Sequence, residues 1–128
     1  MFSVSSLLLI AIIMLILDSI YLSIMKRPFS KLVQSIQHTP MVIRMTPVFL
    51  CYLFLQLLFY YFLIYKRGTI MDAFILGVGV YGVYETTNFA IFKNWDSIPI
   101  SVLDTIWGGI LFASTLYVFQ KVKPFIIE

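Results

Sequence analysis

The sequence predicts an all-α integral membrane protein: a bundle of four transmembrane helices with a short interfacial amphipathic helix between helices 1 and 2. Of its 128 residues, 61% are hydrophobic and only 12% are charged, and the mean hydropathy is +0.97, well outside the usual balance of a soluble domain. The apolar residues also fall into four runs, at about 5–25, 45–65, 71–92 and 98–119. Each run is near the ~20 residues that a helix needs to cross the hydrocarbon core. A single membrane domain over residues 1–128 therefore accounts for the chain.

The first run is expected to be a retained transmembrane helix and not a cleaved signal. No basic residue precedes it, its apolar core is longer than that of a typical signal, and no A-x-A-like site follows it. The second run contains Cys51, the only cysteine of the sequence. A single cysteine excludes both an intramolecular disulfide and a cysteine-based metal site.

The connection between the first two runs has a helical pattern of its own. Its apolar residues recur at i, i+3, i+4 and i+7, and these are Phe29, Leu32, Val33 and Ile36. Polar residues occupy the other face. The pattern predicts a short helix over about 29–37 that lies in the headgroup plane. The alternative is an irregular loop that touches the interface.

Four spans place both termini and the connection at 66–70 on one side of the membrane, and the connections at 26–44 and 93–97 on the other. Basic residues are divided almost equally, four on the first side and five on the second, so the positive-inside rule hardly decides the orientation. They are scattered along membrane-flanking segments and are better explained as headgroup anchors than as a nucleic-acid interface. The expected surroundings are a lipid bilayer, with no nucleic acid.

The third run contains Gly77-x-Gly79-x-x-Gly82, the pattern of a dinucleotide-binding loop. That loop needs a preceding strand and a βαβ unit, neither of which fits a membrane-length apolar run. Together with Ala73, these glycines instead predict small helix surfaces that let a neighbouring backbone approach closely. One such surface is also a candidate contact in a homo-oligomer or larger membrane assembly.

Three acidic residues lie inside the runs: Asp18, Glu85 and Asp104. Each is six to eight residues from a helix end on the same side, which places all three roughly 10 Å beneath one membrane surface. No Lys or Arg lies within the spans, so each acid is expected to face the bundle interior and to be protonated, cation-bound or paired from the rim. Arg44, at the start of the second span, is the candidate rim counter-charge.

Helical spacing gives each acid a polar or aromatic neighbour. The predicted intramembrane polar site comprises Asp18, Tyr21, Tyr84, Glu85, Thr87, Asn88, Asp104, Trp107 and Gly108. Two hypotheses fit it: a site that binds or conducts a proton, a cation or a small polar ligand, and a structural network that only fixes helix packing. No intramembrane His, activated nucleophile or phosphate motif completes an enzyme mechanism, no cofactor is implied, and the pattern leaves metal binding open.

At these residues the sequence resembles domain-of-unknown-function family 2177, a group of small four-helix membrane proteins. The matching elements are Asp18-Ser-Ile-Tyr-Leu22, Tyr84-Glu-Thr-Thr-Asn-Phe-Ala90 and Asp104-Thr-Ile-Trp-Gly108. The family has Trp where this chain has Tyr21, and it usually has Asp where this chain has Glu85. The resemblance implies a four-helix bundle with a shared polar motif, and it supplies no activity.

Overall fold

The computed structural model describes residues 3–95 and 97–126, and every regular element in that part of the chain is helical. The elements are α1 (Val4–Gln37), α2 (Met45–Phe59), which continues as the π-helix η1 (Tyr60–Tyr65), α3 (Ile70–Ile91) and α4 (Ile98–Ile126). The predicted all-α class is therefore confirmed.

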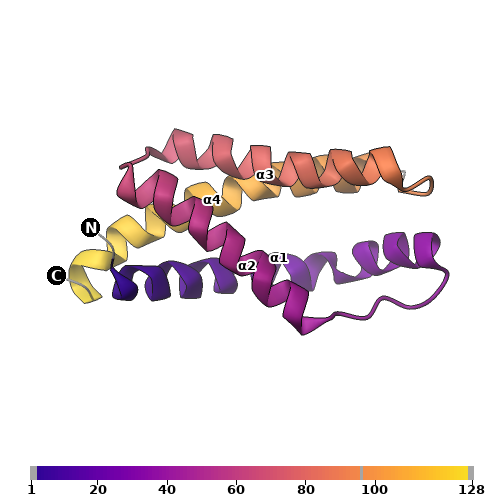
Figure 1. The fold of residues 1–128 in the computed structure, drawn as a ribbon, viewed down its shortest axis with the longest axis horizontal. Helices are drawn as coiled ribbons and strands as arrows, with labels where there is room; N and C mark the ends of the chain where they lie inside the picture. Colours follow the sequence, from indigo (N-terminus) through magenta and orange to yellow (C-terminus); the bar gives the residue numbers. More distant parts are fainter. Residues whose placement is uncertain (1–2, 96, 127–128) are drawn as a thin grey trace.

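The helices are arranged so that alternate connections lie at opposite ends of the molecule. Both chain ends and the α2–α3 connection lie at one end in Figure 1, and the α1–α2 and α3–α4 connections lie at the other. Helices α3 and α4 run side by side and form the closest helix pair, whereas α2 crosses the bundle obliquely. This order matches the alternation that four consecutive spans impose.

By length and composition, three helices are suited to crossing a membrane, not the four that the sequence predicts. They are α1, α2 together with η1, and α4. Helix α3 has 22 residues, which is long enough, but a polar stretch from Glu85 to Asn88 lowers its apolar character. The same residues that suggest a functional site thus weaken the hydropathy signal of the helix that carries them.

The first helix does not end near Met25 but continues to Gln37, so the predicted interfacial segment 29–37 is the last part of α1 and not a separate helix. Pro28 lies inside α1 and removes one backbone hydrogen bond without ending the helix. The end comes at His38, which has a left-handed φ of 60° and whose N–H donates to the Gln34 carbonyl at 2.8 Å.

Segment 29–37, which has the amphipathic pattern, packs partly against the protein itself. Leu32 is buried, and the ring of Phe29 packs edge-on against Tyr21 at 6.4 Å between centroids. The side-chain amide of Asn94, in the α3–α4 turn, donates to the Ser35 carbonyl at 3.2 Å. Segment 29–37 therefore packs partly against the protein, with Leu32 buried, Phe29 against Tyr21 of the same helix and Ser35 bonded to the α3–α4 turn, although the periodicity alone is equally compatible with a lipid surface.

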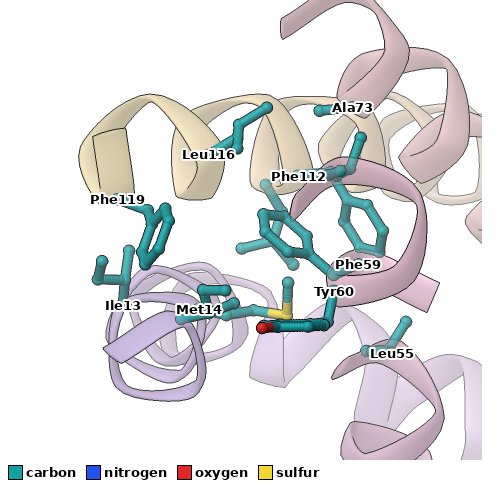
Figure 2. Packing of buried hydrophobic residues seen from close by; sticks show 12 residues of the cluster. Ile13, Met14, Leu55, Phe59, Tyr60, Ala73, Phe112, Leu116 and Phe119 are labelled. Carbon is teal, nitrogen blue, oxygen red and sulfur yellow. The ribbon is translucent and has the colours of Figure 1, made fainter. Parts of the chain in front are cut away.

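A cluster of apolar side chains fills the half of the bundle near the chain ends. We call this cluster the apolar half, and Figure 2 shows its residues converging from all four helices. They are Ile10, Ile13, Met14, Leu55, Phe59, Tyr60, Leu63, Ala73, Leu111, Phe112, Leu116 and Phe119. Phe59 and Phe112 are fully buried and meet edge to face, with ring centroids 5.6 Å apart. Ser3 N–H donates to the Tyr60 hydroxyl at 2.8 Å, which ties the start of α1 to the end of α2.

Glycines let the backbones of α3 and α4 come into direct contact. A Cβ atom added to Gly77 would lie 2.0 Å from the Gly108 carbonyl oxygen, and one added to Gly108 would lie 2.4 Å from the Tyr81 ring. A Cβ at Gly82 would make only ordinary contact, and one at Gly79 would meet nothing within 4 Å. Of the four predicted packing positions, buried Ala73 and Gly77 lie in the core, whereas Gly79 is exposed and contributes no close contact.

Candidate functional site

The three acidic side chains of the predicted site are buried in the half of the bundle opposite the chain ends. Asp18 on α1, Glu85 on α3 and Asp104 on α4 expose 6%, 1% and 5% of their surface. Such low exposure inside apolar helices means that each carboxyl group must obtain its hydrogen bonds from protein groups. We use the name acid site for these three residues and the aromatic donors that contact them, Tyr21, Tyr52, Trp95 and Trp107.

Asp18 joins three helices through its two carboxyl oxygens. The indole Nε1 of Trp107, on α4, donates to Oδ1 at 3.1 Å. The hydroxyl of Tyr52, on α2, donates to Oδ2. Asp18 therefore connects α1 to both α2 and α4. Helix α2 has no acidic residue of its own, so Asp18 links it to the acid site.

Asp104 is contacted from both sides. The Tyr21 hydroxyl, on α1, donates to Oδ1 at 3.0 Å, and the Tyr21 ring stacks on Trp107 with centroids 4.6 Å apart and planes 5° from parallel. On the α3 side, the carboxyl group of Asp104 lies close enough to that of Glu85 for the two groups to interact. Two ionised carboxylates supply only acceptors, so a hydrogen bond between these two groups would need a proton on one of them.

Glu85 has one donor among the described residues. The indole Nε1 of Trp95, in the α3–α4 turn, donates to Oε1 at 3.3 Å. The other oxygen, Oε2, is buried and accepts from no described donor. The buried amide donor Asn88 Nδ2 and the Ser101 hydroxyl likewise have no partner among the described residues. Buried polar atoms of this kind normally have a partner, and a proton on Glu85 or Asp104 would supply one to Glu85 Oε2.

The residues of the acid site lie within the part of the chain that matches a known family. A family model described as "Predicted membrane protein (DUF2177)" matches residues 3–119, which includes all three acids. The chain belongs to this family. No curated protein and no solved structure matches it. Membership in DUF2177 confirms the resemblance noted from the sequence and, with the apolar helices, establishes a multi-pass integral membrane protein.

Not every residue predicted for this DUF2177 polar site lies in it. Tyr84 and Thr87 are exposed. Tyr84 touches the edge of the site, through an edge-on ring contact with Trp95 at 6.4 Å between centroids and a side-chain interaction with Asn88. Gly108 is buried but serves the close approach to α3 described above. Arg44 is exposed and forms no ion pair within the described chain, so the structure does not bring the predicted counter-charge to the acids.

Two residues of the acid site are missing from the sequence prediction. Tyr52 lies seven residues after Met45, where α2 begins, at the end of the bundle where the acids lie. The depth argument used for the acids would have found it. Trp95 lies in the α3–α4 turn, outside any predicted span, and nevertheless exposes only 5% of its surface. The sequence did contain a signal for Trp95, because a large aromatic residue in a short connection between two spans is often buried.

The acid site of this DUF2177 protein is rich in acceptors and in hydroxyl or indole donors. Among the described residues, no group of three or more His, Cys, Asp or Glu side chains is arranged to hold a metal ion. Hydroxyl groups of Tyr21 and Tyr52 can both donate and accept, whereas the indoles only donate. The arrangement is chemically suited to holding a proton between carboxyl groups and to orienting those groups with fixed donors.

Proposed function

We propose that the acid site is an intramembrane proton-binding site, and that the protein exchanges this proton with the membrane surface beside the α3–α4 turn. The observation that carries the proposal is the contact between the Glu85 and Asp104 carboxyl groups. If both were ionised, they would repel each other by about 4 kcal/mol at a separation of ~4 Å, even at an effective dielectric constant near 20. One shared proton removes this repulsion and supplies the missing donor.

A proton accounts for the surroundings better than the cation or small polar ligand that the sequence also allows. Glu85 Oε2 lacks a donor, and a proton on either carboxyl group would provide one. The Tyr21 hydroxyl already occupies Asp104 Oδ1, and Trp95 occupies Glu85 Oε1, which leaves one oxygen of each carboxyl group for the shared proton. A metal ion would require more free oxygen ligands than the described residues leave at this contact.

The proposal includes four membrane spans, adding α3 to the three helices that length and composition indicate. At ~1.5 Å per residue, its 22 residues cover about 33 Å, enough to cross a hydrocarbon core of about 30 Å. Its most polar side chains, Glu85 and Asn88, are buried, so they do not require an aqueous surface along the helix. A cysteine-accessibility map of the four connections and ends would test this topology, because four spans predict that 66–69 and both ends are labelled from one side only.

The proton site itself is testable by infrared difference spectroscopy on the purified protein. A carboxylic acid C=O band that persists at neutral pH is expected in the wild type and should be lost or shifted in Glu85→Gln and in Asp104→Asn. Asp72→Asn is the matched control, because Asp72 is an exposed carboxylate outside the acid site and asparagine can still accept the hydrogen bond from Thr69 N–H. A wild-type spectrum without a protonated carboxyl group at neutral pH would contradict the proposal.

Proton exchange is measured separately, in vesicles with a pH-sensitive dye inside. Wild-type protein is expected to accelerate the response to an external pH step, and the Glu85→Gln and Asp104→Asn variants are expected to lose this acceleration while keeping their helical circular dichroism. The Asp72→Asn variant should behave like the wild type. A protonated carboxyl band without any flux would restrict the site to proton binding.

A structural network is the second candidate, and one observation favours it. Asp18, on α1, accepts hydrogen bonds from α2 and α4 at once and so holds three helices together; we call this arrangement the helix clamp. If Glu85→Gln and Asp104→Asn mainly reduce the amount of folded protein, and the wild type shows neither a protonated carboxyl band nor proton flux, the network only fixes helix packing. Removing the Tyr52 hydroxyl, as described in the Discussion, addresses this clamp directly.

A further inference from the structure

An open hollow of about 440 Å³ lies between the last part of α1 and the start of α4, separate from the acid site. Its lining residues are Arg27, Pro28, Lys31, Leu32, Ser97 and Ile100. Two positive charges and one hydroxyl thus border a space that is otherwise apolar. The described lining includes no carboxylate to neutralise them.

We propose that this hollow binds the phosphate group of an anionic phospholipid. Arg27 and Lys31 are four residues apart on α1, so their side chains project from the same face of the helix. Both are exposed, and neither forms an ion pair within the described chain. Their donors are therefore available to an anion, and the fork of Arg27 is suited to two oxygens of one phosphate.

The opposite wall adds uncharged donors. Ser97 lines the hollow and immediately precedes α4, whose 29 residues begin at Ile98. The first N–H groups of a helix have no partner within the helix, and the helix dipole places partial positive charge there. Pro99 has no N–H, so the amide groups of Ile98 and Ile100 are the free ones in this first turn. Both walls of the hollow thus favour negative charge.

The depth of the hollow favours a lipid over a soluble phosphate. Helices α1 and α4 are both long and apolar enough to cross a membrane, and Lys26 and Arg27 come directly after the apolar part of α1. A residue at that position lies at the level of the lipid headgroups. Leu32, Pro28 and Ile100 provide apolar walls suited to the glycerol and upper acyl carbons, which inorganic phosphate lacks.

Native mass spectrometry of the detergent-solubilised full chain tests the proposal, with phosphatidylglycerol and phosphatidylcholine as the two probes. Wild-type protein is expected to bind phosphatidylglycerol in preference to phosphatidylcholine. Each basic residue near a membrane surface contributes roughly fivefold in affinity, so Arg27→Gln with Lys31→Gln should weaken phosphatidylglycerol binding by about 30-fold. Lys31→Arg, which keeps the charge, should retain binding.

Lys26→Gln is the matched control, because Lys26 is an exposed neighbour of Arg27 that does not line the hollow. An equal loss in Lys26→Gln and in either lining variant would mean that only general surface charge is involved, and this would overturn the proposal. Equal binding of the two lipids by the wild type would also overturn it. Displacement of phosphatidylglycerol by millimolar inorganic phosphate would assign the hollow to a soluble anion instead. None of these outcomes depends on the protonation of the acid site.

Discussion

The two halves of this bundle are held together in different ways. Near the chain ends, the apolar half packs by shape, with Phe59 and Phe112 fully buried between α2 and α4. Near the α3–α4 turn, the acid site replaces much of this apolar packing with hydrogen bonds from aromatic residues to three carboxyl groups. The same four helices thus pass from a dry, apolar contact to a polar network along their length.

The difference shows where function can be built in a small membrane protein. Lipid tails are as apolar as a leucine side chain, so apolar contacts between helices stabilise the bundle by close packing and not by exclusion of water. Buried hydrogen bonds between membrane helices contribute about 0.6–2 kcal/mol each. The acid site therefore adds modest stability for the cost of burying three carboxyl groups, which supports a role beyond packing.

The largest effect on folding is expected at the close contact between α3 and α4. Gly77→Leu should prevent the folded bundle from forming, because even a Cβ atom would lie 2.0 Å from the Gly108 carbonyl oxygen and backbone cannot yield as a side chain does. Gly79→Leu is the matched control and should fold, since nothing lies within 4 Å of a Cβ at that position. Denaturant titration of helical circular dichroism in detergent compares the two. Equal stability of the two variants would mean that the α3–α4 contact is not required.

The next largest effect separates the halves. Phe112→Ala should lower the free energy of unfolding by about 3 kcal/mol, because it leaves a cavity in the apolar half. In the fraction that remains folded, the infrared band of the protonated carboxyl group should be unchanged. A change in that band would show that the acid site depends on packing in the apolar half.

A smaller effect is expected at the helix clamp of the acid site. Tyr52→Phe removes the donor to Asp18 Oδ2 and should cost roughly 1 kcal/mol, less than a deletion in the apolar half. Tyr117→Phe is the control, because Tyr117 is exposed and its ring contact with Lys121, at 5.5 Å, survives the change. Unfolding midpoints of the two variants test the difference. A loss of 3 kcal/mol or more in Tyr52→Phe would favour the structural network over the proton site.

The smallest effect concerns a polar group inside the apolar half. Thr115 is fully buried, and its hydroxyl has no partner among the described residues. Thr115→Val keeps the shape, removes the unsatisfied hydroxyl and should leave stability unchanged or raise it by up to about 1 kcal/mol. Thr105→Val, which deletes a hydroxyl that donates to the Ser101 carbonyl at 2.8 Å, provides the comparison and should gain nothing. Destabilisation by Thr115→Val would reveal a bound water or another partner in the apolar half.

Much of the site could be predicted from the sequence because helix geometry converts residue number into depth. The rise per residue brings Asp18, Glu85 and Asp104 to the same end of a four-helix bundle without any knowledge of packing. The rule could not exclude Tyr84 and Thr87, which share that depth but are exposed, because depth carries no information about rotation around the helix axis. It also could not include Trp95, which reaches Glu85 from a turn.

The sequence by itself determined the membrane class, the all-helical fold, the alternation of the chain ends and connections, and the burial of acidic groups near one end. Only the tertiary structure decided that Glu85 meets Asp104, that Tyr52 binds Asp18, and that segment 29–37 extends α1 instead of forming a separate helix. The physical reason is that hydropathy and helical rise act along one chain, whereas the rotation and pairing of helices depend on contacts such as Gly77 against Gly108.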